Sequence, residues 1–458
     1  MDMMIKLKAV GFLVIGVAAW VSSADVMGPP KLDPNEWWGP EELKSSCAND
    51  SSIRPVRVRF YPEMIRDLKS RIRRHFQRNS RTNFPPVKDA KFNYGFSTTQ
   101  LDSWMKYWLE DYDFEQREEF FNQYQHYKTM IQGLDIHFLW IKPQVPEGVK
   151  VIPLMLLHGW PGSFREFYKA IPLLTQQSEG RDYALELIIP SLPGFGYSDA
   201  PVRSGMGNAH IGVVLKNLMS RLGHEKFYLQ GGDWGSLISS TIATMYQDDV
   251  LGYISNMMFV LNTCTEVSTL AGAAATAAGP PDRLNPMTII IEESGYTLLQ
   301  STKPDTVGIA LADSPIGLFA WIAEKFSTWT RIAHRELEDG GLGFRFTKDE
   351  ILDNVMVYWT SNCITPSMRL DAENFSYKYR ALGIDGYSSK VPAWGIKAKH
   401  EIFAQPPNTL KYPNMVGYSE LEDGGHFLAF ELAELFTKTV LNAIDNIIVY
   451  HRKNKTEL

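Results

Sequence analysis

The chain contains 458 residues, of which 44% are hydrophobic and 21% are charged, and its formal net charge is −6. A chain of this length commonly forms two or three domains, and this apolar content suffices for a large core without long disorder. The slightly acidic balance argues against a nucleic-acid-binding protein. The cysteines Cys47, Cys264 and Cys363 are too few and too widely spaced for a disulfide framework or a metal site, and we interpret them as structural thiols.

The first 24 residues contain an apolar run, residues 9–23, that follows Lys6 and Lys8. Its length, its flanking lysines and the small residues at 22–24 are typical of a cleaved signal peptide. The run can also be extended at both ends, so a retained membrane anchor fits equally well. Residues 63–81 have a basic amphipathic pattern, which is typical of a helix packed on the core and, less often, of a helix that lies on a membrane.

Residues 25–150 begin with the stretch PPKLDPNEWWGPEE, which indicates an extended, docked segment, and continue with helical patterns and two strand-like runs. From residue 151 the pattern changes to apolar runs that indicate buried parallel strands, separated by helical stretches. Strands that alternate with helices predict an α/β fold with a mostly parallel sheet covered on both faces. The apolar runs are 151–163, 183–198, 224–236 and 253–262.

The alternation of strands and helices stops at Asn262, where the small-residue stretch AGAAATAAGPP and then mostly helical patterns follow. Strand-like runs return at 390–398 and 414–421. The simplest architecture is therefore an α/β core, residues 151–261 and 389–458, interrupted by a helical cap of residues 262–388.

The stretch QGGDWGS places Asp233 between glycines at the spacing of a nucleophile elbow, in which the central residue is usually serine. Small neighbours permit the strained turn that exposes the central side chain, and the N-terminus of the following helix stabilises its negative charge. The alternative is an ordinary N-cap aspartate. The glycine spacing directly after a predicted strand favours a catalytic carboxylate.

A base and an orienting acid are expected beyond the carboxyl ends of later strands, at the same edge of the sheet. His426, in EDGGHFLAFE, follows the last predicted strand, where hydrolases with such an elbow carry their base. His158 also ends a strand, but its context HGWPG indicates a residue that shapes a loop. Glu401 and Glu266 each follow a predicted strand, so both are candidates for the acid.

The turn HGWPGS follows the first core strand, so the backbone N–H groups of Trp160 and of Trp234 are candidates for an oxyanion hole. A serine attacks a carbonyl carbon, whereas Asp233 would attack a saturated carbon that bears a leaving group and would form an alkyl ester. Water activated by His426 would then attack the aspartyl carbonyl. The candidate electrophiles are alkyl halides and epoxides. An epoxide oxygen needs a proton, for which a tyrosine of the cap is suited.

With HGWPGS, GGDWGS and GGHF in place, the chain resembles the microsomal-type epoxide hydrolases and, within them, the insect juvenile hormone epoxide hydrolases. The likeness spans roughly residues 33–440 and includes PNEWWGP, PSLPGFGYSDAP, ESGYTLLQSTKPDTVG and VMVYWTSNCI. It implies an α/β-hydrolase fold. It maps the nucleophile onto Asp233, the base onto His426, the acid onto Glu401 and one proton-donating tyrosine onto Tyr296.

The resemblance also implies the substrate and the location. It implies hydrolysis of a lipophilic epoxide, juvenile hormone, to a vicinal diol, with no cofactor, no metal ion and no nucleic acid. The family carries an N-terminal membrane anchor, so residues 1–24 are expected to be an anchor that holds the protein at the endoplasmic reticulum, or microsomal, membrane.

One position departs from the family pattern. The family normally has a second cap tyrosine in a segment that here reads SMRLDAEN, and the tyrosine position holds Asp371. An ionised aspartate cannot donate a proton and would repel a developing alkoxide. Either Tyr296 acts alone, or Tyr377 or Tyr379 substitutes, or an apolar pocket keeps Asp371 protonated.

Two other functions are compatible with these residues. A haloalkane dehalogenase also uses an aspartate nucleophile that is followed by tryptophan, although Tyr296 and the long N-terminal segment argue against it. A catalytically weak or inactive protein that binds lipid epoxides is favoured only by Asp371. Halide release from a chloroalkane would identify the first, and saturable binding without product or covalent adduct would identify the second.

Overall fold

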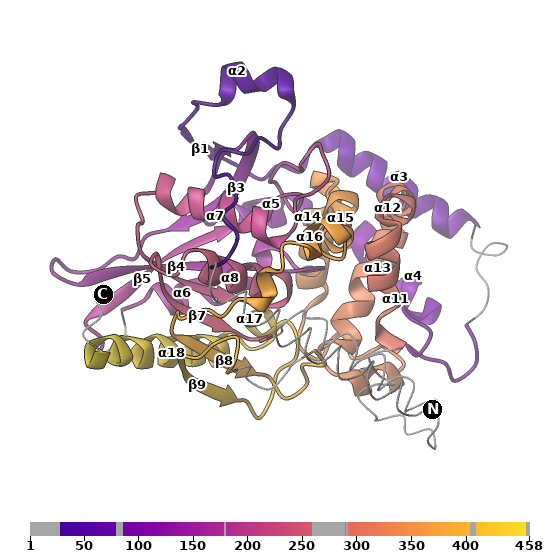
Figure 1. The fold of residues 1–458 in the computed structure, drawn as a ribbon. Helices are drawn as coiled ribbons and strands as arrows, with labels where there is room; N and C mark the ends of the chain where they lie inside the picture. Colours follow the sequence, from indigo (N-terminus) through magenta and orange to yellow (C-terminus); the bar gives the residue numbers. More distant parts are fainter. Residues whose placement is uncertain are drawn as a thin grey trace, which may run out of the picture.

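In the computed structural model, the described residues are 28–78, 86–177, 180–258, 289, 292–403 and 409–454. They form one central sheet with helices packed around it and a helical cap at its side (Figure 1). The sheet contains nine strands in the order β1-β2-β3-β5-β4-β6-β7-β8-β9. The strands are β1 (Ile53–Val56), β2 (His126–Ile131), β3 (Leu134–Ile141), β4 (Lys150–Leu157), β5 (Tyr183–Pro190), β6 (Phe227–Gly231), β7 (Val250–Ser255), β8 (Ala393–Lys397) and β9 (Met415–Glu420).

The sheet has an antiparallel part and a parallel part. Strands β1, β2 and β3 pair antiparallel, and β3 pairs antiparallel with β5. All pairings from β4 to β9 are parallel. The turn between β2 and β3 has a positive φ at both Gln132 and Gly133, which suits a tight hairpin. The predicted mostly parallel sheet is confirmed, and the N-terminal strands extend it at one edge.

The carboxyl ends of the central strands are aligned by their register. Leu157 of β4 pairs with Gly231 of β6, and Gly231 pairs with Ser255 of β7. Every residue of β5, β6 and β7 is buried, which explains why these strands appear in the sequence as continuous apolar runs. The loops that follow β4, β6 and β7 therefore leave the sheet close to one another.

Two groups of helices pack along the parallel strands. Helix α7 contacts α8, and the C-terminal helix α18 contacts α6. Helix α18 was not predicted, although Phe436, Val440, Ile444 and Ile447 form a buried stripe at helical spacing along it. The helices are α6 (Ile171–Thr175), α7 (Asn208–Arg221), α8 (Asp233–Met245), α17 (Leu428–Glu431) and α18 (Ala433–Asn454).

Between β7 and β8 the chain forms the helical cap, which lies beside the sheet in Figure 1. Its start, near residue 262, lies outside the described residues. The cap helices are α11 (Gly295–Thr302), α12 (Pro304–Asp313), α13 (Pro315–Thr328), α14 (Lys348–Ser361), α15 (Ile364–Asn374) and α16 (Tyr377–Arg380), with the short turns η3 (Ile332–Glu336) and η4 (Ile384–Gly386).

The N-terminal helices α3 (Pro62–Arg78) and α4 (Thr98–Glu110) pack on the cap, against α13 and α14. The basic amphipathic pattern corresponds to α3, and its apolar residues Leu68 and Ile72 are buried in the protein. Among the described residues, no single helix is both long and apolar enough to cross a membrane. Helices α12 and α13 are long and apolar enough only when they are taken together, and the chain bends by 116° between them. The expected anchor, residues 1–24, lies outside the described residues.

A buried ion cluster joins the N-terminal region, the core and the cap. Asp353 of α14 is fully buried and accepts hydrogen bonds from Arg165 Nε at 2.9 Å and from the Tyr112 hydroxyl at 3.0 Å. It also pairs with Arg117 of helix α5 (Phe114–Phe121). Loss of one partner from such a cluster would leave a buried charge uncompensated. Asp353 therefore fixes the cap relative to η2 (Phe164–Phe167), the turn that follows β4.

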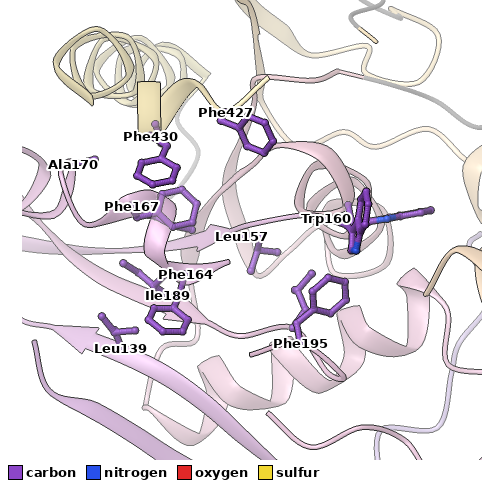
Figure 2. Packing of buried hydrophobic residues seen from close by; sticks show 14 of the residues in the cluster. Leu139, Leu157, Trp160, Phe164, Phe167, Ala170, Ile189, Phe195, Phe427 and Phe430 are labelled. Carbon is purple, nitrogen blue, oxygen red and sulfur yellow. The ribbon is translucent and has the colours of Figure 1, made fainter. Parts of the chain in front are cut away.

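The core extends from the sheet to the edge of the site. Figure 2 shows Phe167 of η2 and Phe430 of α17 pointing into one apolar cluster with Leu157 at the end of β4. Trp160 lies at the edge of the same cluster and is 1% exposed. The loop after β4 is therefore held by core packing as well as by hydrogen bonds.

Candidate active site

Asp233 lies where β6 ends and α8 begins, in a strained turn. Its φ is 50°, in the left-handed region that residues with a side chain seldom adopt. A Cβ atom at Gly235 would lie 2.1 Å from the carbonyl oxygen of Leu157, and a Cβ atom at Gly159 would lie 2.1 Å from Asp233 Oδ1. These glycines therefore let the turn approach β4 and leave room for the Asp233 carboxyl.

Two backbone N–H groups flank the Asp233 carboxyl. The Trp160 N–H donates to Asp233 Oδ1 at 2.7 Å. Trp234 is the second residue of α8, so its N–H is one of the helix N-terminal donors that have no acceptor within the helix. Both candidates for the oxyanion hole thus lie next to Asp233, and one of them already holds Oδ1.

His426 and Glu401 reach Asp233 from beyond the ends of the last two strands. Glu401 lies in the turn after β8, and His426 lies in the loop after β9. His426 Nδ1–H donates to Glu401 Oε2 at 2.9 Å, whereas His426 Nε2 lies 3.5 Å from Asp233 Oδ2, too far for a good hydrogen bond. The structure brings these three side chains together, and the rival Glu266 lies outside the described residues.

Two carboxylates determine the charge of the His426 imidazole. His426 is 5% exposed, and this burial by itself lowers its pKa, because an imidazolium ion loses hydration. The negative charges of Glu401 and Asp233 outweigh the burial and hold the pKa of His426 well above 6.5. The His426 side chain is therefore an imidazolium ion in the resting site at neutral pH. Loss of the Asp233 charge would lower the pKa of His426.

Two residues that the sequence analysis missed fix the backbone around His426. Glu431 accepts hydrogen bonds from the N–H of Gly425 at 2.8 Å and from the N–H of Phe427 at 2.9 Å. The carbonyl oxygen of Trp329 accepts from the His426 N–H at 3.0 Å. Glu431 lies inside the motif GGHFLAFE and was visible in the sequence, whereas Trp329 carries no local signal.

Tyr296 of α11 brings the cap to the site. Its ring stacks on Trp160 with 5.1 Å between centroids and meets the ring of Trp329 edge to face at 5.0 Å. The Lys325 ammonium lies 4.8 Å from the centroid of the Tyr296 ring. Burial raises the pKa of Tyr296 well above 10, and the charge of Asp233 adds to this shift. The phenol therefore keeps its proton.

Asp371 of α15 is 1% exposed. Gln300, one turn after Tyr296 on α11, donates from Nε2 to Asp371 Oδ2 at 3.0 Å. Within the described ranges, no cationic side chain forms an ion pair with Asp371. Burial raises the pKa of its carboxyl well above 3.8; the Gln300 hydrogen bond opposes this shift, and the charge of Asp233 adds to it. These surroundings favour the neutral acid, one of the alternatives that the sequence left open.

The other side chains considered in the sequence lie away from the site. Tyr377 is 90% exposed, and Tyr379 packs in a small separate cluster with Ala209 and Ile384. His158 is buried and bridges two loops: its Nδ1 donates to the Gly159 carbonyl at 3.0 Å, and its Nε2 accepts from the Leu192 N–H at 3.3 Å. Burial lowers the pKa of His158 to about 4, which suits the structural role expected for it.

The fold and the site define an α/β hydrolase with a carboxylate, rather than a hydroxyl, at the elbow. Comparison with family models agrees: residues 152–278 match the alpha/beta hydrolase fold, and residues 53–167 match the epoxide hydrolase N terminus.

Known relatives extend this match over nearly the whole chain. The juvenile hormone epoxide hydrolase of Bombyx mori is 51% identical and covers 91% of this chain and 91% of its own. Epoxide hydrolase 1 of Sus scrofa is 41% identical, over 88% of this chain and 91% of its own. The crystal structure of the Bombyx mori enzyme has a TM-score of 0.85 and 50% identity, and it covers 93% of this chain and 100% of that chain. The chain therefore belongs to the epoxide hydrolase family, which confirms the enzyme class and fold expected from the resemblance.

Proposed function

We propose that this protein hydrolyses a lipophilic epoxide to a vicinal diol through a covalent ester on Asp233. The observation that carries the proposal is an elbow carboxylate with Oδ1 held by the Trp160 N–H and Oδ2 free of a short hydrogen bond. The buried, proton-bearing side chains Tyr296 and Asp371 come from the cap beside it. A carboxylate nucleophile combined with acids suits a strained ether, because the leaving oxygen stays attached to the substrate and needs a proton.

In the first step Asp233 Oδ2 attacks one carbon of the epoxide, and the bond from that carbon to the ring oxygen breaks. The ring oxygen takes a proton from Tyr296 or Asp371. The negative charge of Asp233 helps to raise the pKa of His426 in the resting enzyme. Ester formation removes this charge. The pKa of His426 then falls, so the imidazolium proton restores the cap acid, and His426 becomes a neutral base.

In the second step His426 Nε2 takes a proton from water, and the water oxygen attacks Cγ of the Asp233 ester. Negative charge develops on Oδ1, where the N–H of Trp160 and that of Trp234 stabilise it. The bond from Cγ to the alkyl oxygen breaks, and that oxygen takes the proton from His426 to complete the diol. The new carboxyl proton of Asp233 returns to His426. Glu401 keeps the imidazole in the required orientation throughout.

Asp371 is assigned the role of second proton donor. Asp371 meets the requirements of a general acid. It is buried, and it has no cationic partner among the described residues. Gln300, on the helix that carries Tyr296, orients it through a hydrogen bond. A carboxylic acid that stays neutral in an apolar site can donate a hydrogen bond and a proton, as a phenol does. The tyrosine that the family pattern leads one to expect is then unnecessary.

The substrate we propose is an apolar terpenoid epoxide such as juvenile hormone. Relatives from Bombyx mori and Manduca sexta are named juvenile hormone epoxide hydrolases, with 51% and 38% identity. The rings of Trp160, Tyr296, Trp329 and Phe403 contact one another around the site and suit an apolar molecule. A higher kcat/KM for juvenile hormone than for styrene oxide would support this choice, and the reverse order would contradict it.

The test is the intact mass of a His426→Gln variant incubated with juvenile hormone and with simple epoxides. This substitution leaves the attack by Asp233 possible and removes the base for ester hydrolysis, so an adduct of substrate mass should accumulate. The adduct should be absent from the double variant Asp233→Ala, His426→Gln.

The other outcomes identify the rival functions. If the folded variant binds epoxides but forms no adduct with any of them, the protein is a binding protein and not a hydrolase. Adduct formation and halide release from a chloroalkane, without reaction of epoxides, would indicate a dehalogenase.

We further propose that residues 1–24 anchor the protein in the endoplasmic reticulum membrane, where an apolar substrate concentrates. The apolar run at residues 9–23 and the apolar character of the substrate class support this proposal. The full chain should stay with microsomes in alkaline carbonate, whereas a chain without residues 1–24 should be released. Release of both would contradict an anchor.

A further inference from the structure

A water-sized cavity is lined in part by Asp233 and His426. It offers about 20 Å³ for the centre of a water molecule, and roughly 10–15 Å³ by this measure is enough for one water. Its lining includes Asp233, His426, Gly159 and Glu166. Three of these residues belong to the site already described, whereas Glu166 does not.

Glu166 belongs to η2 and has no part in the chemistry described above. Its Oε1 accepts a hydrogen bond from the Ser163 N–H at 3.1 Å, as half of a capping box. The carboxyl lies over Gly162, where a Cβ atom would come within 1.5 Å of Oε1. Among the described residues it has no cationic side chain in an ion pair, although Arg165 beside it is bound to Asp353. In the part of the chain that the structure describes, Glu166 Oε2 accepts no hydrogen bond and forms no ion pair, and Glu166 lines the cavity, so this oxygen is available to a water there.

The charged groups that face Glu166 come from three elements: Asp233 of α8, His426 after β9, and Glu431 of α17. The pKa of Glu166 is raised to about 8, chiefly by burial; the charge of His426 opposes this shift, and the charges of Asp233 and Glu431 contribute to it. At neutral pH the side chain is therefore a neutral acid that can both donate and accept a hydrogen bond.

Ester hydrolysis needs a water molecule that is held before it reacts. His426 Nε2 and Asp233 Oδ2 are 3.5 Å apart, and the cavity borders both side chains. A buried water normally makes about three hydrogen bonds, within a range of two to four. The neutral His426 of the ester state supplies one acceptor, and a second polar group is needed to fix the water.

We propose that Glu166 is this second group: it holds the hydrolytic water in the cavity, against His426 Nε2 and in line with Cγ of the Asp233 ester. This inference rests on the proposed two-step reaction and concerns only its second step. The water proton passes to His426, the water oxygen bonds to Cγ, and the bond from Cγ to the alkyl oxygen breaks. Glu166 keeps its own proton throughout.

The experiment compares ester formation and ester decay in Glu166→Met and Glu166→Gln by quenched-flow intact mass. Met removes both polar oxygens at similar length, so ester decay should slow by about 10- to 100-fold, up to the scale of a misplaced reactant. Ester formation should change by less than about threefold. When decay limits turnover, kcat and KM fall together and kcat/KM is preserved. Gln keeps a donor and an acceptor and should restore most of the decay rate.

Ser163→Ala is the matched control, because it removes the hydroxyl half of the same capping box and leaves the Glu166 carboxyl in the cavity. Its ester should decay at nearly the wild-type rate. Equal slowing in Ser163→Ala and Glu166→Met would make Glu166 a structural residue and overturn the inference. Wild-type decay in Glu166→Met would also overturn it. Absence of any ester in His426→Gln would instead overturn the proposed function.

Discussion

The two sides of the site are held in different ways. On the core side, Asp233 and His426 are fixed by hydrogen bonds of 2.7 Å to the Trp160 N–H and 2.9 Å to Glu401. On the cap side, Tyr296 is held by ring contacts, and Asp371 receives a hydrogen bond from Gln300 at 3.0 Å. The core side is thus oriented by hydrogen bonds to charged side chains, and the cap side by ring packing and one hydrogen bond from an amide.

This difference corresponds to two chemical requirements. A nucleophile and a base must face their targets within a few tenths of an ångström, because the rate of each step depends on orientation. A proton donor needs only an acidic hydrogen near the leaving oxygen. Two donors can share that task, and a carboxylic acid can replace a phenol, so the cap side tolerates a change of residue type that the core side would not.

The largest expected effect is on the core side, from Asp233→Ala. Removal of the nucleophile should lower kcat by about 10⁶-fold, the scale measured when the nucleophile of a hydrolase is deleted. Steady-state diol formation measures the loss, with ligand binding as the control for folding. Residual activity above about 1% would mean that a water molecule attacks the epoxide directly and that the core side is not covalent.

Glu401→Gln should have the next largest effect. It removes one of the two charges that raise the pKa of His426 and weakens the hold on Nδ1, and loss of such an orienting carboxylate costs about 10³- to 10⁴-fold. The pKa of His426, followed by NMR of its imidazole, should fall in Glu401→Gln. An unchanged pKa with reduced activity would assign Glu401 to orientation alone.

The core side could be predicted well from the sequence because its signals are local. Asp233 lies in a glycine pattern after an apolar run, and His426 lies in a motif after the last strand. Glu401 and Glu266 could not be separated by position, since both follow strands; the family resemblance chose between them. The structure then adds the hydrogen bond of Glu401 to His426 and the register of the strands.

The cap side and the supports of the site depend on contacts between distant segments, which leave no local pattern. Gln300 reaches Asp371 across two helices, and the Trp329 carbonyl reaches the His426 N–H. Strand β1 was missed for another reason: it reads IRPV, with Pro55 and no alternation of apolar residues. Proline is tolerated there because the strand lies at the edge of the sheet.

A smaller effect is expected from each cap donor alone. Tyr296→Phe and Asp371→Asn should each slow ester formation by about 10- to 100-fold, and the double variant by about 10²- to 10⁴-fold, within the range of general-acid catalysis. Quenched-flow intact mass measures the rate of ester formation. Asp371→Tyr keeps an O–H donor and should retain most of the rate. A double variant no slower than Tyr296→Phe would show that Asp371 donates nothing.

The smallest effect is on stability, and it separates the neutral acid of the cap from the charged pairs of the core. The pKa of Asp371 is raised well above 3.8 in the folded protein and is near 3.9 in an unfolded chain. Between these two values the folded state binds a proton that the unfolded state lacks, so stability falls by up to about 1.4 kcal/mol per pH unit as pH rises. Asp371→Asn has no such proton, so its free energy of unfolding should increase relative to that of the wild type as pH rises from 5 to 7.

Thermal unfolding at pH 5, 6 and 7 measures this trend, and Asp182→Asn is the matched control because its carboxyl is 80% exposed. A stability difference that does not change between pH 5 and 7 would mean that Asp371 is ionised in the folded protein over that range and cannot be the second donor. The expected result would show that one buried carboxyl lowers stability at neutral pH while it supplies the proton for ring opening. The carboxylates of the core differ from Asp371 because each has a charged partner: His426 lies between Glu401, at 2.9 Å, and Asp233, at 3.5 Å.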